Sequence, residues 1–441
     1  MFISTYWISL RINIIYSILT DSLLYFFLIF LYQSRSLDLN MIFFNSAFLF
    51  FWLLMSYIIG RYQDSDTDLI IFIKHFFFSI INFFILFSFG YFSIYKFLNF
   101  KDNKFFNQNF LFFLKYIFLS FLVQFILKNI LKNKFNFIEE WNVLGSSKFF
   151  NKLSKNINTK IKLNLISLED IIYDETKLTK NIVVENLSNL NHTSQKEVMK
   201  LNFKGFNVVS IINWCEMVLH RIPLNFLEAE ELLNFFSNVN RNNSFQIRLK
   251  RIGDIFFSMI LILLLLPLLI FFAFLIYFED RGPIFYFQKR VGKNGKNFNI
   301  CKLRTMNINA EKDGIQWSKK IDSRITKVGK FLRSTRIDET PQLFMVLFGD
   351  MSLIGPRPER PEIDETLKEK IPFYELRYLV KPGLSGWAQV NYPYGSSIND
   401  SEAKLTYDFF YIKNFSSWLD LLIFFKTIRL VSRREGSNPI N

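Results

Sequence analysis

Two neighbouring carboxylates, Asp338 and Glu339, lie in the stretch RIDETPQLFMVLFGDMSLIGPRPER, which runs from 336 to 360. Prolines on both sides of Arg357 restrict its backbone, so the guanidinium has little conformational freedom left to lose. A guanidinium binds phosphate in a bidentate manner, and carboxylates hold divalent cations such as Mg²⁺. Carboxylates beside fixed cations therefore suit phosphoryl transfer. The structural alternative is that Asp338 only caps a helix and Glu339 only faces its dipole.

More basic residues precede this stretch in the segment FQKRVGKNGKNFNICKLRTM, residues 287–306. Its two glycines, Gly292 and Gly295, predict the turn of a β-hairpin. Alternation along a strand would place Lys302 and Arg304 on one face, where two cations could bind an anionic ligand. The alternative is a basic strand that lies against lipid headgroups.

The elements that position these residues begin with a membrane region. Half of the 441 residues are hydrophobic, and four apolar runs occupy 12–32, 41–60, 70–95 and 108–128. Each is long enough to cross a bilayer as a helix. A carboxylate at mid-membrane costs about 2.5–3.5 kcal/mol, so Asp21 should either face the interior of the helix bundle or lie near a helix end, and we prefer a shallow interfacial position.

The orientation of this region follows from basic residues at its ends. Three lysines after the fourth run place that end in the cytoplasm, although three lysines before it, in a loop that should then be external, point the other way. The two sets are Lys128, Lys132 and Lys134, and Lys96, Lys101 and Lys104.

A fifth apolar run spans 254–280 and contains Pro267 near its centre. Basic residues flank it on both sides, which favours cytoplasmic ends. Because proline removes a hydrogen bond and breaks or kinks a helix, we expect a helix–break–helix hairpin that enters one leaflet and returns. An ordinary kinked spanning helix is the alternative.

Between these regions, residues 139–245 alternate apolar runs with helix-like segments, which predicts a Rossmann-like α/β module. The expected strands are at 141–145, 162–168, 181–185 and 206–211. Only Gly145 is present where a dinucleotide fingerprint needs three glycines. We therefore expect a structural or regulatory module without a cofactor.

Charge and composition exclude other classes of protein. The net charge is +15, but the cations are spread along membrane flanks and do not gather on one soluble face, which argues against nucleic-acid binding. Two cysteines and three scattered histidines offer no spacing for a His/Cys metal site. The first four apolar runs contain one acidic residue, Asp21. A lipid phosphotransferase with several acidic residues inside the membrane is therefore disfavoured.

The segment from about 248 to 438 resembles the bacterial sugar transferases, also called monotopic phosphoglycosyl transferases. Four blocks carry the resemblance in family order: QKRVGKNGKNFNICKLRTM, FLRSTRIDETPQLFMVLFGDMSLIGPRPE, KPGLSGWAQVNY and YDFFYIKNFSSWLDL. The whole chain resembles the long form of this family, the polyprenyl glycosylphosphotransferases that prime exopolysaccharide or O-antigen synthesis. INWCEMVLHRIPLNFL is similar to the segment that closes their middle domain. Arg336 and Thr340 depart from the family pattern.

The resemblance implies transfer of a sugar 1-phosphate from a UDP-sugar to undecaprenyl phosphate, with release of UMP. It implies that Asp338 is the nucleophile of a covalent phosphosugar intermediate and that Glu339 holds Mg²⁺. It places Arg333, Arg357, Lys302 and Arg304 near the phosphates. The long form favours glucose or galactose and is compatible with a homodimer. A membrane anchor with a decayed transferase domain is the rival interpretation.

The expected architecture is a membrane protein that is α plus α/β, in the bacterial inner membrane with its catalytic domain on the cytoplasmic face. It comprises four transmembrane helices in 1–135, a Rossmann-like α/β module in 139–245 and a monotopic phosphoglycosyl transferase domain in 248–441. The last domain contains the re-entrant membrane helix hairpin at 254–280, which is broken at Pro267. Membrane lipids are expected partners.

Overall fold

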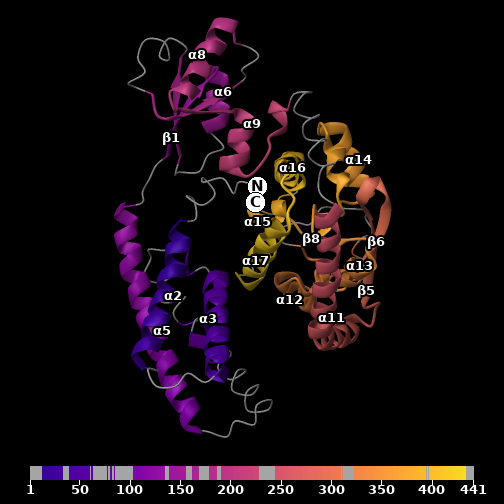
Figure 1. Ribbon diagram of the computed structural model, residues 1–441. Helices are drawn as coiled ribbons and strands as arrows, with labels where there is room; N and C mark the ends of the chain where they lie inside the picture. Colours follow the sequence, from indigo (N-terminus) through magenta and orange to yellow (C-terminus); the bar gives the residue numbers. More distant parts are fainter. Residues whose placement is uncertain are drawn as a thin grey trace. The chain divides into compact units, whose positions relative to one another are not determined.

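The computed structural model describes a mixed protein of helices and sheets (Figure 1). The residues described are 12–32, 39–59, 61–62, 77, 80–81, 84, 103–134, 139–154, 161–167, 178–185, 190–227, 244–308, 310, 322–393, 395 and 397–433. The chain forms two compact units, Met1–Val209 and Ser210–Asn441. The predicted apolar run at 70–95 lies almost wholly outside the described residues.

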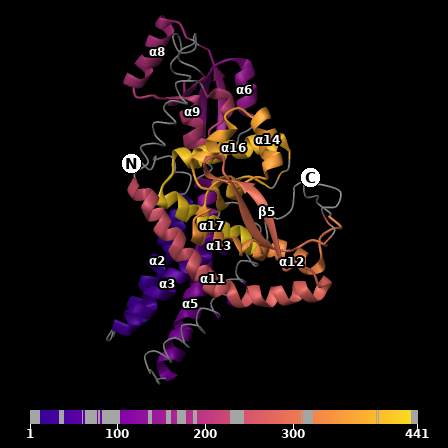
Figure 2. The same ribbon diagram turned by 90° about the vertical axis from the view of Figure 1, so that its right-hand side faces the viewer.

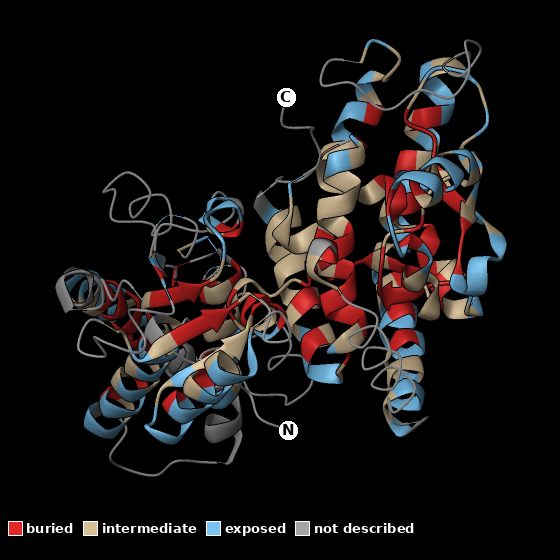
Figure 3. Cartoon of the chain, turned by 90° about the horizontal axis from the view of Figure 1, so that it is seen from above, coloured by how far each residue is buried: buried red, intermediate tan, exposed pale blue. Residues whose placement is uncertain are grey.

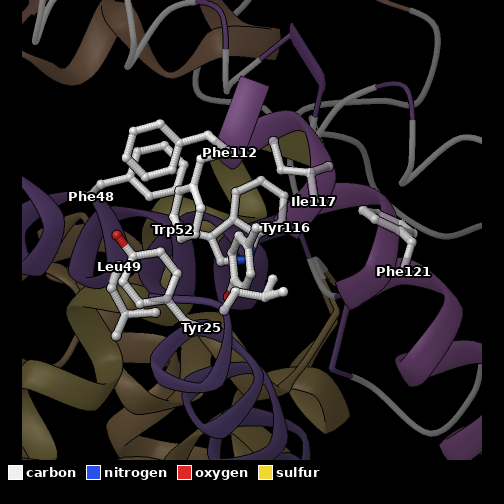
Figure 4. Packing of buried hydrophobic residues seen from close by; sticks show 10 residues of the cluster. Tyr25, Phe48, Leu49, Trp52, Phe112, Tyr116, Ile117 and Phe121 are labelled. Carbon is white, nitrogen blue, oxygen red and sulfur yellow. The ribbon is translucent and has the colours of Figure 1, made fainter. Parts of the chain in front are cut away.

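Among its described residues, the first unit contains three long apolar helices, α2 (Ile12–Tyr32), α3 (Leu39–Ile59) and α5 (Asn103–Lys134). Aromatic rings fill the space between them, as Figure 4 shows for Tyr25, Phe48, Trp52 and Tyr116. Apolar side chains also cover the outside, which is typical of helices in lipid. Three segments of the described helices are long and apolar enough to cross a membrane. Two are in this unit, Ile14–Leu31 and Phe110–Leu127, and one is in the second unit, Phe245–Asp280. These helices identify the chain as a membrane protein.

Asp21 faces the interior of the helix bundle, which was the alternative to the preferred interfacial position. Its side chain is fully buried between the helices and is paired with Arg61, whose Nη1 lies 3.3 Å from Oδ2. It also accepts hydrogen bonds from Tyr62 Oη and Ser120 Oγ, both at 2.7 Å, and from Gln124 Nε2 at 3.0 Å. A carboxylate is tolerated inside a bundle when a cation and several donors replace its water.

Arg61→Gln should therefore destabilise the helix bundle by about 3–5 kcal/mol, because it leaves Asp21 buried without its counter-ion. Thermal unfolding in detergent micelles measures the change. The double variant Asp21→Asn/Arg61→Gln should recover most of the loss, since no buried charge is then unpaired. An Arg61→Gln protein as stable as the wild type would contradict a role of the pair in stability.

The rest of the first unit is built on a four-stranded sheet in the order β2-β1-β3-β4. The strands are β1 (Glu139–Leu144), β2 (Ile161–Ile166), β3 (Asn181–Val184) and β4 (Asn207–Ser210). They fall at the four predicted apolar runs, and β1 pairs in parallel with both β2 and β3. Helices α6 (Ser147–Ser154) and α8 (His192–Phe203) complete this part. Figure 3 shows buried residues along the strands.

The turn after β1 is occupied by a carboxylate of the protein itself. Glu185 Oε2 accepts a hydrogen bond from the backbone N of Ser146 at 2.8 Å. A side chain at Gly145 would collide with the same carboxylate, whose Oε2 would lie 2.7 Å from the added Cβ. An anionic ligand at this turn would therefore meet a negative charge.

In the second unit, the fifth apolar run belongs to one helix, α11 (Ser244–Asp280), with Pro267 inside it. Figure 2 shows that α11 bends, so that its two halves run in different directions. The predicted break into two separate helices is not present. The helix bends because Pro267 has no N–H to donate to the preceding turn, and helical structure continues on both sides of the proline.

Both ends of α11 form polar contacts with other elements of the second unit. Near its start, Arg251 donates to the carbonyls of Val346 at 2.6 Å and Leu347 at 2.7 Å, and Asp254 accepts from the backbone N of Leu353 at 3.0 Å. At its end, Asp280 pairs with Arg304. Between these ends, many apolar side chains are exposed, among them Leu263 and Leu264 at 67% and 69%.

The described residues of the second unit also form two small sheets. The predicted hairpin is confirmed as β5 (Phe285–Val291) and β6 (Asn297–Leu303), joined through the short helix η4 (Lys293–Gly295). The strands β7 (Ser352–Ile354) and β8 (Gly383–Ser385) pair in parallel. They approach so closely that a side chain on Gly383 would place Cβ 2.1 Å from Gly355 N.

Helices fill the remainder of this unit: α12 (Lys327–Thr335), α13 (Gln342–Phe348), α14 (Pro361–Lys370), α15 (Trp387–Asn391), α16 (Ile398–Lys413) and α17 (Ser417–Arg433). The short helices η5 (Ile337–Glu339) and η6 (Tyr374–Leu379) connect them.

The segment INWCEMVLHRIPLNFL forms α9 (Ile211–Trp214), η2 (Cys215–Leu219) and η3 (Leu224–Phe226). These elements belong to the second unit and pack against α16. Glu216 pairs with Lys413 at 2.7 Å, and the backbone N of Ile222 donates to the Thr406 carbonyl at 2.9 Å. The segment that follows the last strand of the α/β sheet is thus attached to α16 by both charge and backbone.

Candidate active site

The two candidate carboxylates lie on η5, between α12 and α13. Arg336 ends α12 in the left-handed conformation, with φ 59°, and this turns the chain so that Asp338 and Glu339 follow in a tight 3₁₀ turn. Asp338 does not cap α13, since Pro341 occupies the cap position without a side-chain hydrogen bond. The capping interpretation of Asp338 is therefore wrong.

Glu339 is buried and surrounded by three cations. Arg357 donates two hydrogen bonds to Glu339, from Nη2 to Oε1 at 2.6 Å and from Nη1 to Oε2 at 3.3 Å. Lys302 Nζ and Arg336 Nη1 both lie 3.5 Å from Oε1. Burial alone would raise the pKa of Glu339, but Arg357, Lys302 and Arg336 hold it well below its usual range. Glu339 is therefore ionised.

Asp338 has a different environment. Burial, followed by the negative charge of Glu339, raises the pKa of Asp338 to about 6, against the lowering effect of Lys302, Arg336 and Arg333. Its Oδ1 is buried and has no hydrogen-bond partner among the described residues. A carboxylate with an uncommitted oxygen, next to a cluster of cations, is equipped to attack an electrophilic phosphorus atom.

Lys302 comes from β6 and reaches the carboxylates from the hairpin. Burial lowers the pKa of Lys302 to about 8, although Glu339 opposes this shift. The cations Arg357 and Arg290 also lower it. The amine thus remains mostly protonated at neutral pH and stays a partner for anionic groups.

The other predicted phosphate-binding residues are placed differently. Arg333 Nε donates to Thr305 Oγ1 at 2.9 Å, and no ion pair of Arg333 occurs in the described part of the chain. Its charge is nevertheless close enough to lower the pKa of Asp338. Arg304 lies beyond the end of β6 and pairs with Asp280, the last residue of α11. The structure therefore brings Lys302 and Arg357 to Glu339, but it joins Arg304 to the membrane helix.

Among the residues that sequence analysis did not assign to the site, Arg336 contacts Glu339 directly. Arg377 and Asp408 form a buried pair, with Nη2 of Arg377 3.3 Å from Oδ2 of Asp408. The sequence offered one signal for Asp408, a single carboxylate within the apolar stretch LTYDFFYI. Nothing in the sequence around Arg377 distinguishes it from a surface arginine.

The site can also be examined as a magnesium site. Mg²⁺ is usually held by one or two carboxylates together with substrate phosphates. Glu339 is ionised, and among the described residues its Oε2 accepts one hydrogen bond, from Arg357. The Oδ1 atom of Asp338 is uncommitted as well. The pair fits a cation whose remaining ligands come from a substrate; no group of three or more His, Cys, Asp or Glu side chains occurs among the described residues.

The comparison with known proteins places the chain in a family. Residues 245–434 match the bacterial sugar transferase family. A UDP-glucose:undecaprenyl-phosphate glucose-1-phosphate transferase of Caulobacter vibrioides is 39% identical over 181 residues, which are 41% of this chain and 68% of that protein. The chain belongs to the bacterial sugar transferase family.

Two longer relatives match the same region. One is the UDP-N-acetylgalactosamine-undecaprenyl-phosphate N-acetylgalactosaminephosphotransferase of Aeromonas hydrophila, 50% identical over 189 residues, 43% of this chain and 45% of that protein. The other is the UDP-glucose:undecaprenyl-phosphate glucose-1-phosphate transferase of Klebsiella pneumoniae, 40% identical over 188 residues, 42% of this chain and 40% of that protein. The matches thus span less than half of these two relatives.

The raised pKa of Asp338 can be tested directly. In protein labelled with ¹³C at aspartate carboxyls, one resonance that is lost in Asp338→Asn should titrate near pH 6. Glu339→Gln removes the negative charge that raises this pKa, so the titration of Asp338 should move to lower pH. NMR in detergent micelles measures both.

Asp408 supplies an internal control, because burial also raises its pKa to about 6, while Glu359, not Glu339, is the negative charge that adds to the shift. Its titration should stay in place in Glu339→Gln. An Asp338 resonance that titrates near 4 in the wild-type protein would show that its burial and its coupling to Glu339 are misassigned.

Proposed function

We propose that this chain is a phosphoglycosyl transferase that moves a sugar 1-phosphate from a UDP-sugar to undecaprenyl phosphate and releases UMP. The observation that carries the proposal is the uncommitted, buried Oδ1 of Asp338 beside Glu339 and its three cations. The names of the relatives, each an undecaprenyl-phosphate sugar phosphotransferase, support the substrate class.

In the first step, a carboxylate oxygen of Asp338 attacks the phosphorus atom that bears the sugar. The P–O bond to the UMP phosphate breaks, and UMP leaves with that bond's electron pair. The enzyme then carries an aspartyl phosphosugar. In the second step, a phosphate oxygen of undecaprenyl phosphate attacks the same phosphorus, and the Asp338 carboxylate leaves. Two displacements thus replace one direct transfer.

Lys302 and Arg357 supply positive charge where charge accumulates on the departing phosphate. Glu339 would hold Mg²⁺, which, when bound, neutralises the diphosphate of the donor. Arg336 and Lys302 would keep Glu339 ionised for that purpose by lowering its pKa. Arg333, whose charge reaches Asp338, remains a proposed phosphate-binding residue. Arg304 is proposed to orient the hairpin against the end of α11.

We further propose that the second unit is monotopic and that α11 is a re-entrant helix in the cytoplasmic leaflet of the bacterial inner membrane. A straight helix of 37 residues would be about 55 Å long, more than a bilayer needs. The bend and the attachment of both ends to one polar unit support entry and return on the same side. Three helices of the first unit, with a fourth expected at 70–95, would anchor the chain, and β1–β4 would form the Rossmann-like module.

The sugar remains open to experiment. The relatives' names give N-acetylgalactosamine in one case and glucose in another, and the long-form resemblance favours glucose or galactose. The assembly of the chain into a homodimer is likewise an expectation. The rival interpretation, a decayed anchor, is disfavoured because Asp338, Glu339 and the Pro356–Arg357–Pro358 loop are all in place.

Asp338→Asn should abolish both transfer and the covalent adduct, because an amide is too weak a nucleophile to displace UMP. Purified protein with Mg²⁺, undecaprenyl phosphate and radiolabelled UDP-glucose, UDP-galactose or UDP-N-acetylgalactosamine measures both. Asp350→Asn is the matched control: this exposed aspartate in the same motif should tolerate the change with nearly full activity. Substantial turnover by Asp338→Asn would rule out the nucleophile.

The topology of α11 can be tested with single cysteines, since the two native cysteines are buried. Arg248→Cys and Pro283→Cys place thiols beside the two ends of the apolar run, and Leu264→Cys places one near its bend. Both end positions should react with a membrane-impermeant maleimide from the cytoplasmic face only. Leu264→Cys should be protected from this reagent. Labelling of the two ends from opposite faces would show a spanning helix.

A further inference from the structure

The loop Pro356–Arg357–Pro358 is held through its three consecutive carbonyl groups. Gly383 N donates to the Pro356 carbonyl at 2.9 Å, and Arg290 Nη1 donates to the Pro358 carbonyl at 3.1 Å. The central carbonyl, that of Arg357, accepts from Arg377 Nη2 at 2.6 Å. Arg357, which pairs with Glu339, is therefore itself held in place through its main-chain carbonyl by Arg377.

Arg377 is embedded in the interior of the second unit. It is only 9% exposed, its guanidinium lies 4.9 Å from the centre of the Tyr374 ring, and Nη1 donates to the hydroxyl of the same tyrosine. Its counter-ion, Asp408, is 2% exposed and projects from α16. Arg377 thus joins α16 and η6 to the loop that carries Arg357.

A buried ion pair of this kind contributes little net stability, because desolvation of both charges offsets their attraction. Its directional hydrogen bonds, by contrast, define a single geometry. A planar guanidinium held by a carboxylate and an aromatic ring can present one N–H to one carbonyl in a fixed direction. The position of Arg377 is therefore better explained by orientation of the loop than by stability.

We propose that Arg377, oriented by Asp408, is a positioning residue for sugar-phosphate transfer: it fixes the main chain of Arg357 so that the guanidinium meets Glu339 and the phosphates of the donor. This inference rests on the proposed function. Neither Arg377 nor Asp408 bonds to Asp338 or Glu339, so the pair acts through Arg357. Arg290 and Gly383 hold the flanking carbonyls but leave the central one to Arg377.

The effect should appear in one half of the reaction. Arg357 is positioned for the donor, so a misplaced loop slows formation of the aspartyl adduct and release of UMP. Release of UMP can be measured without lipid acceptor in a single turnover. The kcat/KM for undecaprenyl phosphate in the complete reaction should stay near the wild-type value, because in a two-step displacement this ratio reports the second half alone. A general loosening of the fold would change both.

The decisive experiment is a double-mutant cycle between Asp408→Asn and Arg357→Gln in the full-length protein. Asp408→Asn keeps the size of the side chain and removes the charge that orients Arg377. In the wild-type background it should slow single-turnover release of UMP by about tenfold to a hundredfold, the range expected when a supporting contact of a site is removed. In the Arg357→Gln background it should slow release by less than about threefold. Equal losses in the two backgrounds would overturn the proposal.

Arg377→Gln provides a second arm of the cycle and should show the same dependence on Arg357. The matched control is Asp364→Asn on α14. Asp364 is as buried as Asp408, at 1% exposure, and accepts a hydrogen bond from Tyr378 on η6, but it does not bond to the loop. Its effect on UMP release should be the same in both backgrounds; coupling of Asp364 to Arg357 equal to that of Asp408 would contradict a specific role.

Thermal unfolding of every variant identifies losses that come from unfolding. Turnover by the wild-type protein distinguishes failure of the proposed function from failure of the positioning role of Arg377. No turnover with any UDP-sugar would refute the proposed function. An active wild type whose Asp408 and Arg357 losses simply multiply would refute only the positioning role.

Discussion

The burial of Glu339 is the constraint on which the site depends. A carboxylate inside a protein is tolerated only when cations and donors replace its water. Lys302 comes from the β5–β6 hairpin, Arg336 from the left-handed turn that ends α12, and Arg357 from the loop after β7. Three parts of the second unit are therefore brought together by one negative charge. Asp338, one residue earlier, shares the burial but not the pairing, and this difference separates the pKa values of the two carboxyl groups.

A short series of contacts also connects the same carboxylates to α11. Helix α13 starts just after Glu339, and its last carbonyls, those of Val346 and Leu347, accept hydrogen bonds from Arg251 of α11. A cation at the C-terminal end of a helix is also favoured by the helix dipole. The position of α13, and of the carboxylates just before it, relative to α11 is thus set by one short chain of contacts. Such a connection suits an enzyme whose acceptor presents its phosphate at the interface while its hydrocarbon remains in lipid.

Much of the local structure was predictable from the sequence, because local patterns decide it. Short apolar runs marked β1–β4, and the glycines marked the β5–β6 turn. Residue types suggested Glu339 and Arg357 as partners in one site, and the family resemblance added Lys302. The sequence could not decide between alternatives where the outcome depends on a distant partner. Asp21 is buried because Arg61 and three donors from other parts of the chain surround it.

By itself, the sequence determined that this is a membrane protein with a carboxylate pair, a rigid arginine loop and a bent or broken apolar segment at Pro267. These features follow from composition, spacing and the covalent limits of proline, which do not depend on context. Only the tertiary structure decided that Arg304 joins Asp280, that Arg336 joins Glu339, and that Arg377 holds the carbonyl of Arg357. Each of these choices depends on which charges are desolvated together, and this is settled by the packing of segments far apart in the chain.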